Sequence, residues 1–185
     1  MKKTSILALF GLAVAAVCCA AETPAAASPD KAPDPNADFK TYASGEKAIY
    51  WSQMFGSKKY VPRGKVEIAD GKVTIIGGKA EMTGIWFFRS HKLPKFRIEP
   101  GDIVKISLTA SGSGQLGLSI DGYRADKQHY HCYRKTFDLA AEPKTICQEF
   151  RLNQVCVQIY PSIYVTGDGK ATVSDFKLEV IPAEL

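Results

Sequence analysis

The sequence predicts an all-β protein, an antiparallel β-sandwich of the jelly-roll kind, preceded by a signal peptide and a flexible linker. Three observations favour this fold class. Short segments of alternating apolar and polar residues recur along the chain, turn residues separate them about every eight to twelve residues, and no stretch has the period of an amphipathic helix. The pattern is clearest at the end of the chain, where Phe176, Leu178 and Val180 alternate with charged residues after a Gly-Asp-Gly turn. This alternation predicts a closing strand with one buried face.

Residues 1–21 have the pattern of a secretory signal peptide. Two lysines precede an uncharged run of twelve residues, 6–17, which is too short to cross a bilayer as a helix. Small residues then suit cleavage before Glu22. We therefore expect a secreted or periplasmic protein without a transmembrane segment. Cys18 and Cys19 leave a lipid-anchored surface protein as the alternative, although neither follows the small residue that an acylated cysteine requires.

The residues after the leader divide into a spacer and one domain. Residues 22–35 are rich in Ala, Pro and Asp and contain too few apolar side chains to fold, which predicts a flexible linker. Residues 36–185 then form a single β-sandwich domain of ordinary size.

The charge of the chain is weakly basic. The formal net charge is +5, and removal of the two leader lysines leaves +3. Such a mixed surface gives no reason to expect a nucleic-acid partner. We interpret a basic cluster in the middle of the sequence as a solvated loop, with a patch for acidic glycans or lipid headgroups as the alternative: Arg89, His91, Lys92, Lys95 and Arg97.

Turn residues place the first strands of the domain. Asp70-Gly71 lies between two alternating segments, 66–68 and 73–75, and predicts a hairpin. An aromatic strand follows at 85–88, and Pro100-Gly101 predicts a turn with the glycine at positive φ. Later strands are expected around residues 104–110, 116–120, 137–139, 146–152 and 155–159.

This order of strands and turns carries a family resemblance. Asn36-Ala-Asp-Phe39 resembles an opening motif in which an Asn and a Phe begin the first strand, Trp51 stands at the place of an early tryptophan, and Val173–Leu178 is similar to a closing strand. Residues 98–108 resemble the central turn and strand of the same family. The chain thus resembles the carbohydrate-binding modules of the family 4/9 type, which are galactose-binding-like jelly rolls. The resemblance implies a non-catalytic domain that binds a polysaccharide or glycan.

The same resemblance implies a structural calcium where the first and last strands meet. Its ligands include a glutamate just after the opening Phe and an aspartate in the closing strand. Asp175 is present in this chain, but Lys40 occupies the glutamate position. Because a cation opposes a divalent ion that takes oxygen ligands, we expect no calcium and no other cofactor, and a Lys40–Asp175 ion pair in its place.

The candidate ligand site lies around a segment rich in tyrosine and polar side chains, 123–133. Sugar recognition needs flat aromatic rings and neighbouring hydrogen-bonding groups, and this segment contains both. The alternative is that its tyrosines pack on the sheet with wet hydroxyls. The proposed ligand-binding residues are Asp121, Tyr123, Tyr130 and Arg134, with Trp86 at the opposite end of a groove.

The remaining aromatic residues have other expected places. Strand alternation favours the core for Trp51 and Phe87. Tyr160 and Tyr164 flank Pro161, which favours a bend or an edge position, and they could form part of a site at a loop end.

The domain has three cysteines, so one pair at most can form within it: Cys132, Cys147 and Cys156. If the segments 146–152 and 155–159 form a hairpin, Cys147 and Cys156 lie across its turn. That pair is favoured over Cys132–Cys147, and three reduced thiols are the alternative. Zinc or copper at His129 and His131 is disfavoured, because further ligands are not evident in the sequence.

The sequence lacks the motifs of the common catalytic sites. It contains no Gly-x-Ser-x-Gly, no His-Glu-x-x-His and no phosphate-binding loop. The function favoured by the sequence is therefore a secreted, non-catalytic module that binds carbohydrate. The alternative is a structural or adhesive protein of the cell envelope that contacts another protein, such as one at a cell surface, through the same β-sandwich.

Overall fold

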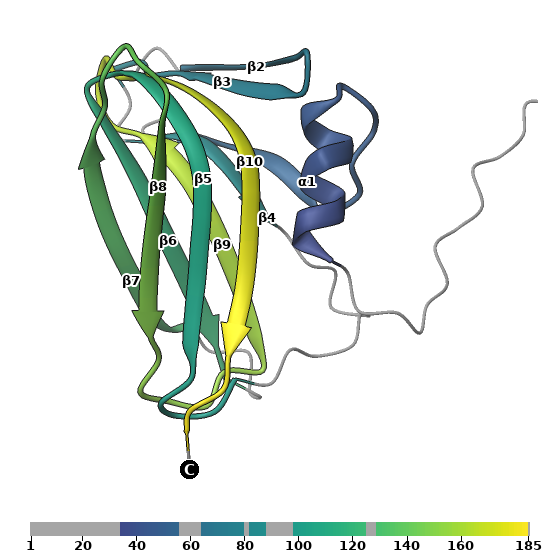
Figure 1. Cartoon of the computed structure of the whole chain (residues 1–185), viewed down its shortest axis with the longest axis vertical. Helices are drawn as coiled ribbons and strands as arrows, with labels where there is room; N and C mark the ends of the chain where they lie inside the picture. The colour runs from purple at the N-terminus through teal and green to yellow at the C-terminus, as the bar shows by residue number, and fades with distance from the viewer. Residues whose placement is uncertain (1–33, 56–63, 80–81, 88–97, 125–128, 185) are drawn as a thin grey trace, which may run out of the picture.

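A computed structural model describes residues 34–55, 64–79, 82–87, 98–124 and 129–184. It confirms the predicted all-β sandwich, in which two five-stranded antiparallel sheets pack face to face (Figure 1). Sheet A has the strand order β1-β4-β9-β6-β7, and sheet B has the order β2-β3-β10-β5-β8. The predicted signal peptide, residues 22–33 of the linker and the basic cluster at 89–97 lie outside the described residues.

The chain crosses several times between the two sheets, with β2 and β3 adjacent in sheet B and β6 and β7 adjacent in sheet A. Within the described residues, no helix has the length and apolar character that a membrane crossing needs. The bounds are α1 Pro35–Ala43, β1 Trp51–Phe55, β2 Lys65–Ala69, β3 Lys72–Ile76, β4 Thr83–Phe87, β5 Ile103–Ser113, β6 Gln115–Tyr123, β7 His129–Asp138, β8 Lys144–Arg151, β9 Gln158–Val165 and β10 Lys170–Ile181.

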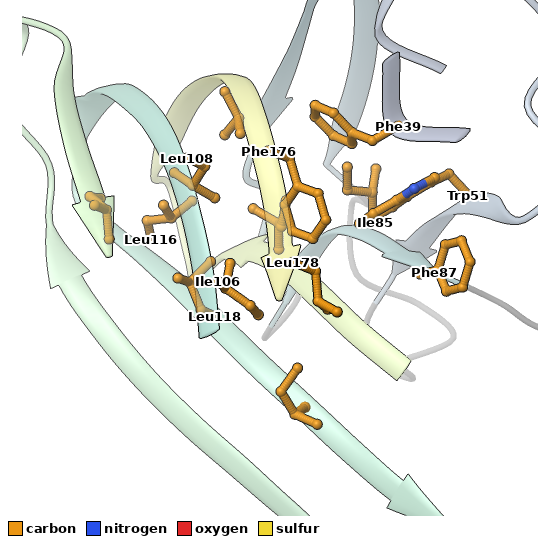
Figure 2. Close-up of a cluster of buried hydrophobic side chains, with 14 of the residues drawn as sticks. Phe39, Trp51, Ile85, Phe87, Ile106, Leu108, Leu116, Leu118, Phe176 and Leu178 are labelled. Carbon is orange, nitrogen blue, oxygen red and sulfur yellow. The ribbon is translucent and has the colours of Figure 1, made fainter. Parts of the chain in front are cut away.

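The core lies between the sheets and is built by strand alternation. In β5 and β6 every second residue points inward, and each of these side chains is at most 1% exposed: Val104, Ile106, Leu108, Leu116, Leu118 and Ile120. Burial of such a side chain contributes about 1.5–3 kcal/mol. A cluster of four aromatic rings closes one end of this core (Figure 2). The ring centroid of Trp51 lies 5.2 Å from that of Phe39, 5.6 Å from that of Phe87 and 5.1 Å from that of Phe176. The core positions predicted for Trp51 and Phe87 are thereby confirmed.

The strand expected at Asn36–Phe39 is instead the first turn of helix α1. Asp34 is the N-cap, where its side chain accepts the Asn36 N–H at 2.9 Å, and Pro35 occupies the first turn, where its missing N–H is not needed. The helix lies beside β10 (Figure 1). The amide of Asn36 pairs with the backbone of Leu178, because its Nδ2 donates to the Leu178 carbonyl at 3.1 Å and its Oδ1 accepts the Leu178 N–H at 2.6 Å.

Two predicted features of sheet B are confirmed. Strands β2 and β3 form a hairpin in which Asp70 (φ 53°) and Gly71 (φ 70°) both have positive φ, as a type I′ turn requires. The closing strand β10 lies in the middle of sheet B, between β3 and β5. Phe176 and Leu178 are buried in it, at 2% and 8% exposed.

The predicted hairpin of residues 146–159 is wrong. β8 belongs to sheet B, whereas β9 belongs to sheet A, so the chain crosses between the sheets after Arg151. Cys147 is exposed in β8, opposite Ser107, and Cys156 is buried in a backbone bridge with Ile98. These two thiols and that of Cys132 are free, so the favoured Cys147–Cys156 disulfide is not formed.

Candidate functional site

The face of sheet A that points away from sheet B, here called the outer face, carries several aromatic and charged side chains. In β6 the outward positions alternate with buried Leu116, Leu118 and Ile120, and in β9 they alternate with inward Ile163 and Val165. The outward residues of the four strands β4, β9, β6 and β7 include Gly84, Trp86, Tyr160, Ser162, Tyr164, Gln115, Gly117, Ser119, Asp121, Tyr123, Cys132, Arg134, Thr136 and Asp138.

Three adjacent strands bring three aromatic rings together on this face. The Tyr160 ring of β9 stands edge-on to the Tyr123 ring of β6, with centroids 5.0 Å apart and an interplanar angle of 88°. On its other side the centroid of Trp86 from β4 is 6.3 Å away. Trp86 and Tyr123 are half-buried and Tyr160 is almost fully buried. We call Trp86, Tyr160 and Tyr123 the aromatic cluster.

Small residues separate the large ones in the row that crosses the sheet at Trp86. Trp86 is paired with Ser162, Ser162 with Ser119, and Ser119 with Arg134 on the outermost strand β7. Strands are about 4.8 Å apart, so this row extends about 14 Å from Trp86 to Arg134. Both serines are buried among larger neighbours, at 1% and 3% exposed.

A polar group lies at the β7 end of this row. Arg134 is exposed, and its Nε donates a hydrogen bond of 2.8 Å to the Cys132 sulfur. Asp121 of β6 is paired with Cys132 in the register. Burial, and then a hydrogen bond with Asp121, raise the pKa of the Cys132 thiol to about 11. The thiol is therefore protonated at neutral pH and is no candidate for a nucleophile, which would need a lowered pKa.

Tyr164 of β9 packs tightly onto the same face. A Cβ at Gly117 of β6 would overlap the Tyr164 ring, so only a glycine admits the ring at this position. Burial raises the pKa of Tyr164, and also that of Tyr123, so both hydroxyls stay protonated at neutral pH and can donate hydrogen bonds.

The structure brings four of the five predicted ligand residues onto one face. Asp121 and Tyr123 lie in β6, Trp86 in β4 and Arg134 in β7. Tyr130 belongs to the backbone of β7, but its side chain lies outside the described residues, as do the side chains of His129 and His131. Sequence reasoning placed Trp86 at the opposite end of a groove, and in the structure its ring centroid lies 6.3 Å from that of Tyr160.

Tyr160 and Tyr164 were assigned to a bend or an edge by the sequence, and this assignment is wrong. They point outward from β9, a central strand of sheet A. Their alternation with Ile159, Ile163 and Val165 was a signal for this strand, and Pro161 between them obscured it. The proline is tolerated because the ladder between β4 and β9 covers Ser162–Val165 and does not include Pro161.

A separate cleft of about 420 Å³ lies where α1 approaches β10 and the β2–β3 turn. Asp175 lines it in a left-handed conformation (φ 55°) at the β-bulge of β10. The residues of this cleft do not fit the calcium that the family resemblance implied, because one carboxylate faces two lysines: its lining is Phe39, Lys40, Ala43, Gly71, Asp175, Phe176 and Lys177.

The predicted Lys40–Asp175 ion pair is not formed either. Asp175 instead accepts a hydrogen bond of 2.8 Å from the neighbouring Ser174 hydroxyl. The ion pairs found in the described part of the chain join Lys65 to Glu67 and Lys105 to Glu149. The described residues also contain no group of three or more His, Cys, Asp or Glu side chains that could hold a metal ion.

Comparison with known proteins gives a likeness of fold. No protein-family profile matches the chain, and no curated protein matches it in sequence. Among solved structures, a family 4 carbohydrate-binding module is similar to it with a TM-score of 0.49 and 15% identity, over 70% of this chain and 94% of that one. The xylan-binding domain CBM22-1 of Xyn10C from Paenibacillus barcinonensis matches with a TM-score of 0.49 and 10% identity, over 73% and 88% of the two chains.

A third similar structure belongs to a much larger protein. The enzymatically active domain of tailspike protein 4 from bacteriophage CBA120 matches with a TM-score of 0.53 and 9% identity. The match covers 83% of this chain but 22% of the tailspike chain. At 9% identity, this likeness is one of fold alone.

Proposed function

We propose that this protein is a non-catalytic domain that binds carbohydrate on the outer face of sheet A. The observation that carries the proposal is the aromatic cluster, in which three adjacent strands contribute Trp86, Tyr160 and Tyr123 beside the charged groups of Asp121 and Arg134. The proposal rests on these side chains, and not on the sugars named for the structures that the chain resembles.

The chemistry of this face suits a sugar chain. An aromatic ring offers a flat apolar surface to the C–H face of a pyranose, while neighbouring polar groups bind the hydroxyls and fix the orientation. The row from Trp86 to Arg134 has a large ring at one end and a guanidinium group at the other, with two buried serines between them. Its length, about 14 Å at the usual strand spacing, accommodates more than one pyranose ring.

The carboxylates of the face are badly placed for glycoside hydrolysis. That reaction takes two carboxyl groups about 5–10 Å apart. Among the described outward residues the carboxylates are Asp121 and, at the far end of β7, Asp138. Asp138 is six residues from the partner of Asp121, Cys132, which corresponds to about 20 Å along a strand. Binding without turnover is therefore the function we propose.

We also propose that the protein acts outside the cytoplasm. Support comes from the leader pattern at residues 1–21 and from the linker composition that follows it.

The experiment is a binding screen of the purified protein against neutral and acidic polysaccharides by affinity electrophoresis and calorimetry. We expect saturable binding that Trp86→Ala weakens by at least about tenfold, because the ring that stacks on the sugar is removed. Trp86→Phe should retain part of the affinity, since it keeps a flat ring. Ile49→Ala is the control, because Ile49 is an apolar side chain, 64% exposed, outside the sheets.

Two results would contradict the proposal. One is the absence of binding to every polysaccharide while the protein is folded, which would favour the adhesive alternative. The other is undiminished binding by a folded Trp86→Ala variant, which would place the sugar elsewhere.

A further inference from the structure

The guanidinium group of Arg134 is oriented by the protein but not saturated by it. Arg134 extends from β7, the outermost strand of sheet A, and is exposed. Its Nε donates to the Cys132 sulfur at 2.8 Å. Within the described residues, no hydrogen bond or ion pair uses the two Nη nitrogens. The two Nη nitrogens therefore remain available to a ligand, while Nε is held by the Cys132 sulfur.

The contact that holds Arg134 is stable across the physiological pH range. The Cys132 thiol stays protonated, so it accepts from Arg134 without forming a thiolate ion pair. Asp121 hydrogen-bonds the thiol from the neighbouring strand, and its negative charge further favours the charged form of Arg134. Asp121 is half-buried, whereas Arg134 is exposed, so an approaching ligand meets the positive group first.

We propose that the saccharide bound by the outer face is acidic, and that a carboxylate of a uronic-acid residue pairs with the Nη nitrogens of Arg134. This inference rests on the proposed function, and it names the class of sugar. A guanidinium matches a carboxylate with two parallel hydrogen bonds, which a lysine or a neutral side chain cannot reproduce. The row of Ser119 and Ser162 then leads from the bound carboxylate to the Trp86 ring.

Cys132 is a positioning residue in this proposal. It touches Arg134 and not the sugar, and it aligns the guanidinium by accepting the Nε hydrogen bond. Sulfate esters present the same anionic oxygens as a uronic acid, so the experiment must separate the two sources.

The test compares polygalacturonate with its fully methyl-esterified form, which has the same backbone without the charge. Dextran sulfate serves as the sulfated probe. We expect the wild-type protein to bind polygalacturonate at least about tenfold more tightly than the ester, and Arg134→Gln to abolish this difference. Arg151→Gln is the matched control, because Arg151 is an exposed arginine at the end of the edge strand of the other sheet.

Each result has one meaning. Equal affinity for polygalacturonate and its ester overturns the inference but leaves the proposed function standing, whereas no binding to either overturns both. An equal loss in Arg151→Gln also overturns it, because the attraction is then a general effect of charge. Preference for dextran sulfate that Arg134→Gln removes supports an anionic ligand held by Arg134, with sulfate as its source.

The role of Cys132 is tested separately, by the ratio of the affinity for polygalacturonate to the affinity for its methyl ester. Cys132→Ala should reduce the preference for polygalacturonate over the ester. Cys132→Ser should restore the preference, because a hydroxyl also accepts from Nε. A Cys132→Ala variant that keeps the full preference contradicts the positioning role.

Discussion

Gly117 shows how one residue shapes the outer face. It lies in β6 against the ring of Tyr164 from β9, where any side chain would overlap the ring carbons. We expect Gly117→Ala to lower the free energy of unfolding by about 1–3 kcal/mol, the usual penalty for overpacking. Urea denaturation measures this change. The effect should shrink when Tyr164→Ser is also present, since the overlap is then removed; strictly additive effects would contradict this explanation.

Cys132 provides a second test at the residue scale. The pKa of its thiol is raised to about 11 by burial and by Asp121. At pH 8 we therefore expect about a hundredfold less thiolate than an ordinary cysteine has, and correspondingly slow alkylation. Peptide mass spectrometry after timed exposure to iodoacetamide measures the rate, with exposed Cys147 as the internal control. Cys132 should react fully once the protein is unfolded, and native alkylation as fast as that of Cys147 would contradict the structure.

The candidate site was predictable where it depends on residue type and alternation. Asp121 and Tyr123 were assigned from their segment, and both lie on the outer face. Contacts between distant segments were not predictable, because alternation gives the face of a strand but not its neighbours in the sheet. The pairing of β9 with both β4 and β6, which places Tyr160 between Trp86 and Tyr123, left no direct trace in the sequence.

At the scale of elements, helix α1 occupies the place beside β10 that the sequence assigned to a strand. The bulge between Ser174 and Lys177 interrupts β10, and its ladder with β3 ends at Val173. Beyond this point the Asn36 amide supplies the donor and the acceptor for the backbone of Leu178. The Asn and Phe of the opening motif thus lie beside the last strand, as the resemblance implied, but they belong to a helix and not to a strand. A Pro-Asn start after Asp34 was the available signal for that helix.

This arrangement predicts the effect of losing the Asn36 side chain. Asn36→Ala leaves the N–H and C=O of Leu178 without their partners, and we expect a loss of about 1–3 kcal/mol in the free energy of unfolding. Asn36→Asp should have a smaller effect, because it still accepts the Leu178 N–H. The matched control is Thr41→Ala, since the Thr41 hydroxyl bonds within α1, to the Ala37 carbonyl at 3.3 Å. Equal stability of Asn36→Ala and Thr41→Ala would contradict the role given to Asn36.

Asp38 connects the helix to the first strand. Its carboxylate accepts the backbone N–H groups of Ile49, Tyr50 and Trp51 at 3.1, 3.0 and 3.0 Å. We expect Asp38→Ala to destabilise the protein by about 1.5–3 kcal/mol, the range for hydrogen bonds to a charged group. Asp38→Asn retains one acceptor oxygen and should have an intermediate effect. Thermal and urea unfolding together measure both variants, and a neutral Asp38→Ala would show that solvent replaces the carboxylate.

At the scale of the whole molecule, the sandwich brings segments from opposite ends of the chain together. α1 lies beside β10, which is itself central in sheet B (Figure 1). The aromatic core of Phe39, Trp51 and Phe176 joins the same segments (Figure 2). At this junction the chain packs three rings and places Lys40 and Lys177 with Asp175 in the adjacent cleft.

The junction therefore predicts a domain whose stability does not depend on calcium. Among the described residues, the side chains that line this cleft include one carboxylate and two lysines, which is a poor set of ligands for a divalent cation. Binding of an ion to the folded state would raise the melting temperature. We expect equal melting temperatures in millimolar calcium chloride and in EDTA, measured by scanning calorimetry. Magnesium chloride at equal ionic strength controls for screening of surface charges. A rise that is specific to calcium and is abolished by Asp175→Ala would mean that the cleft binds the ion despite its lysines, and that ring packing alone does not hold the two ends of the chain together.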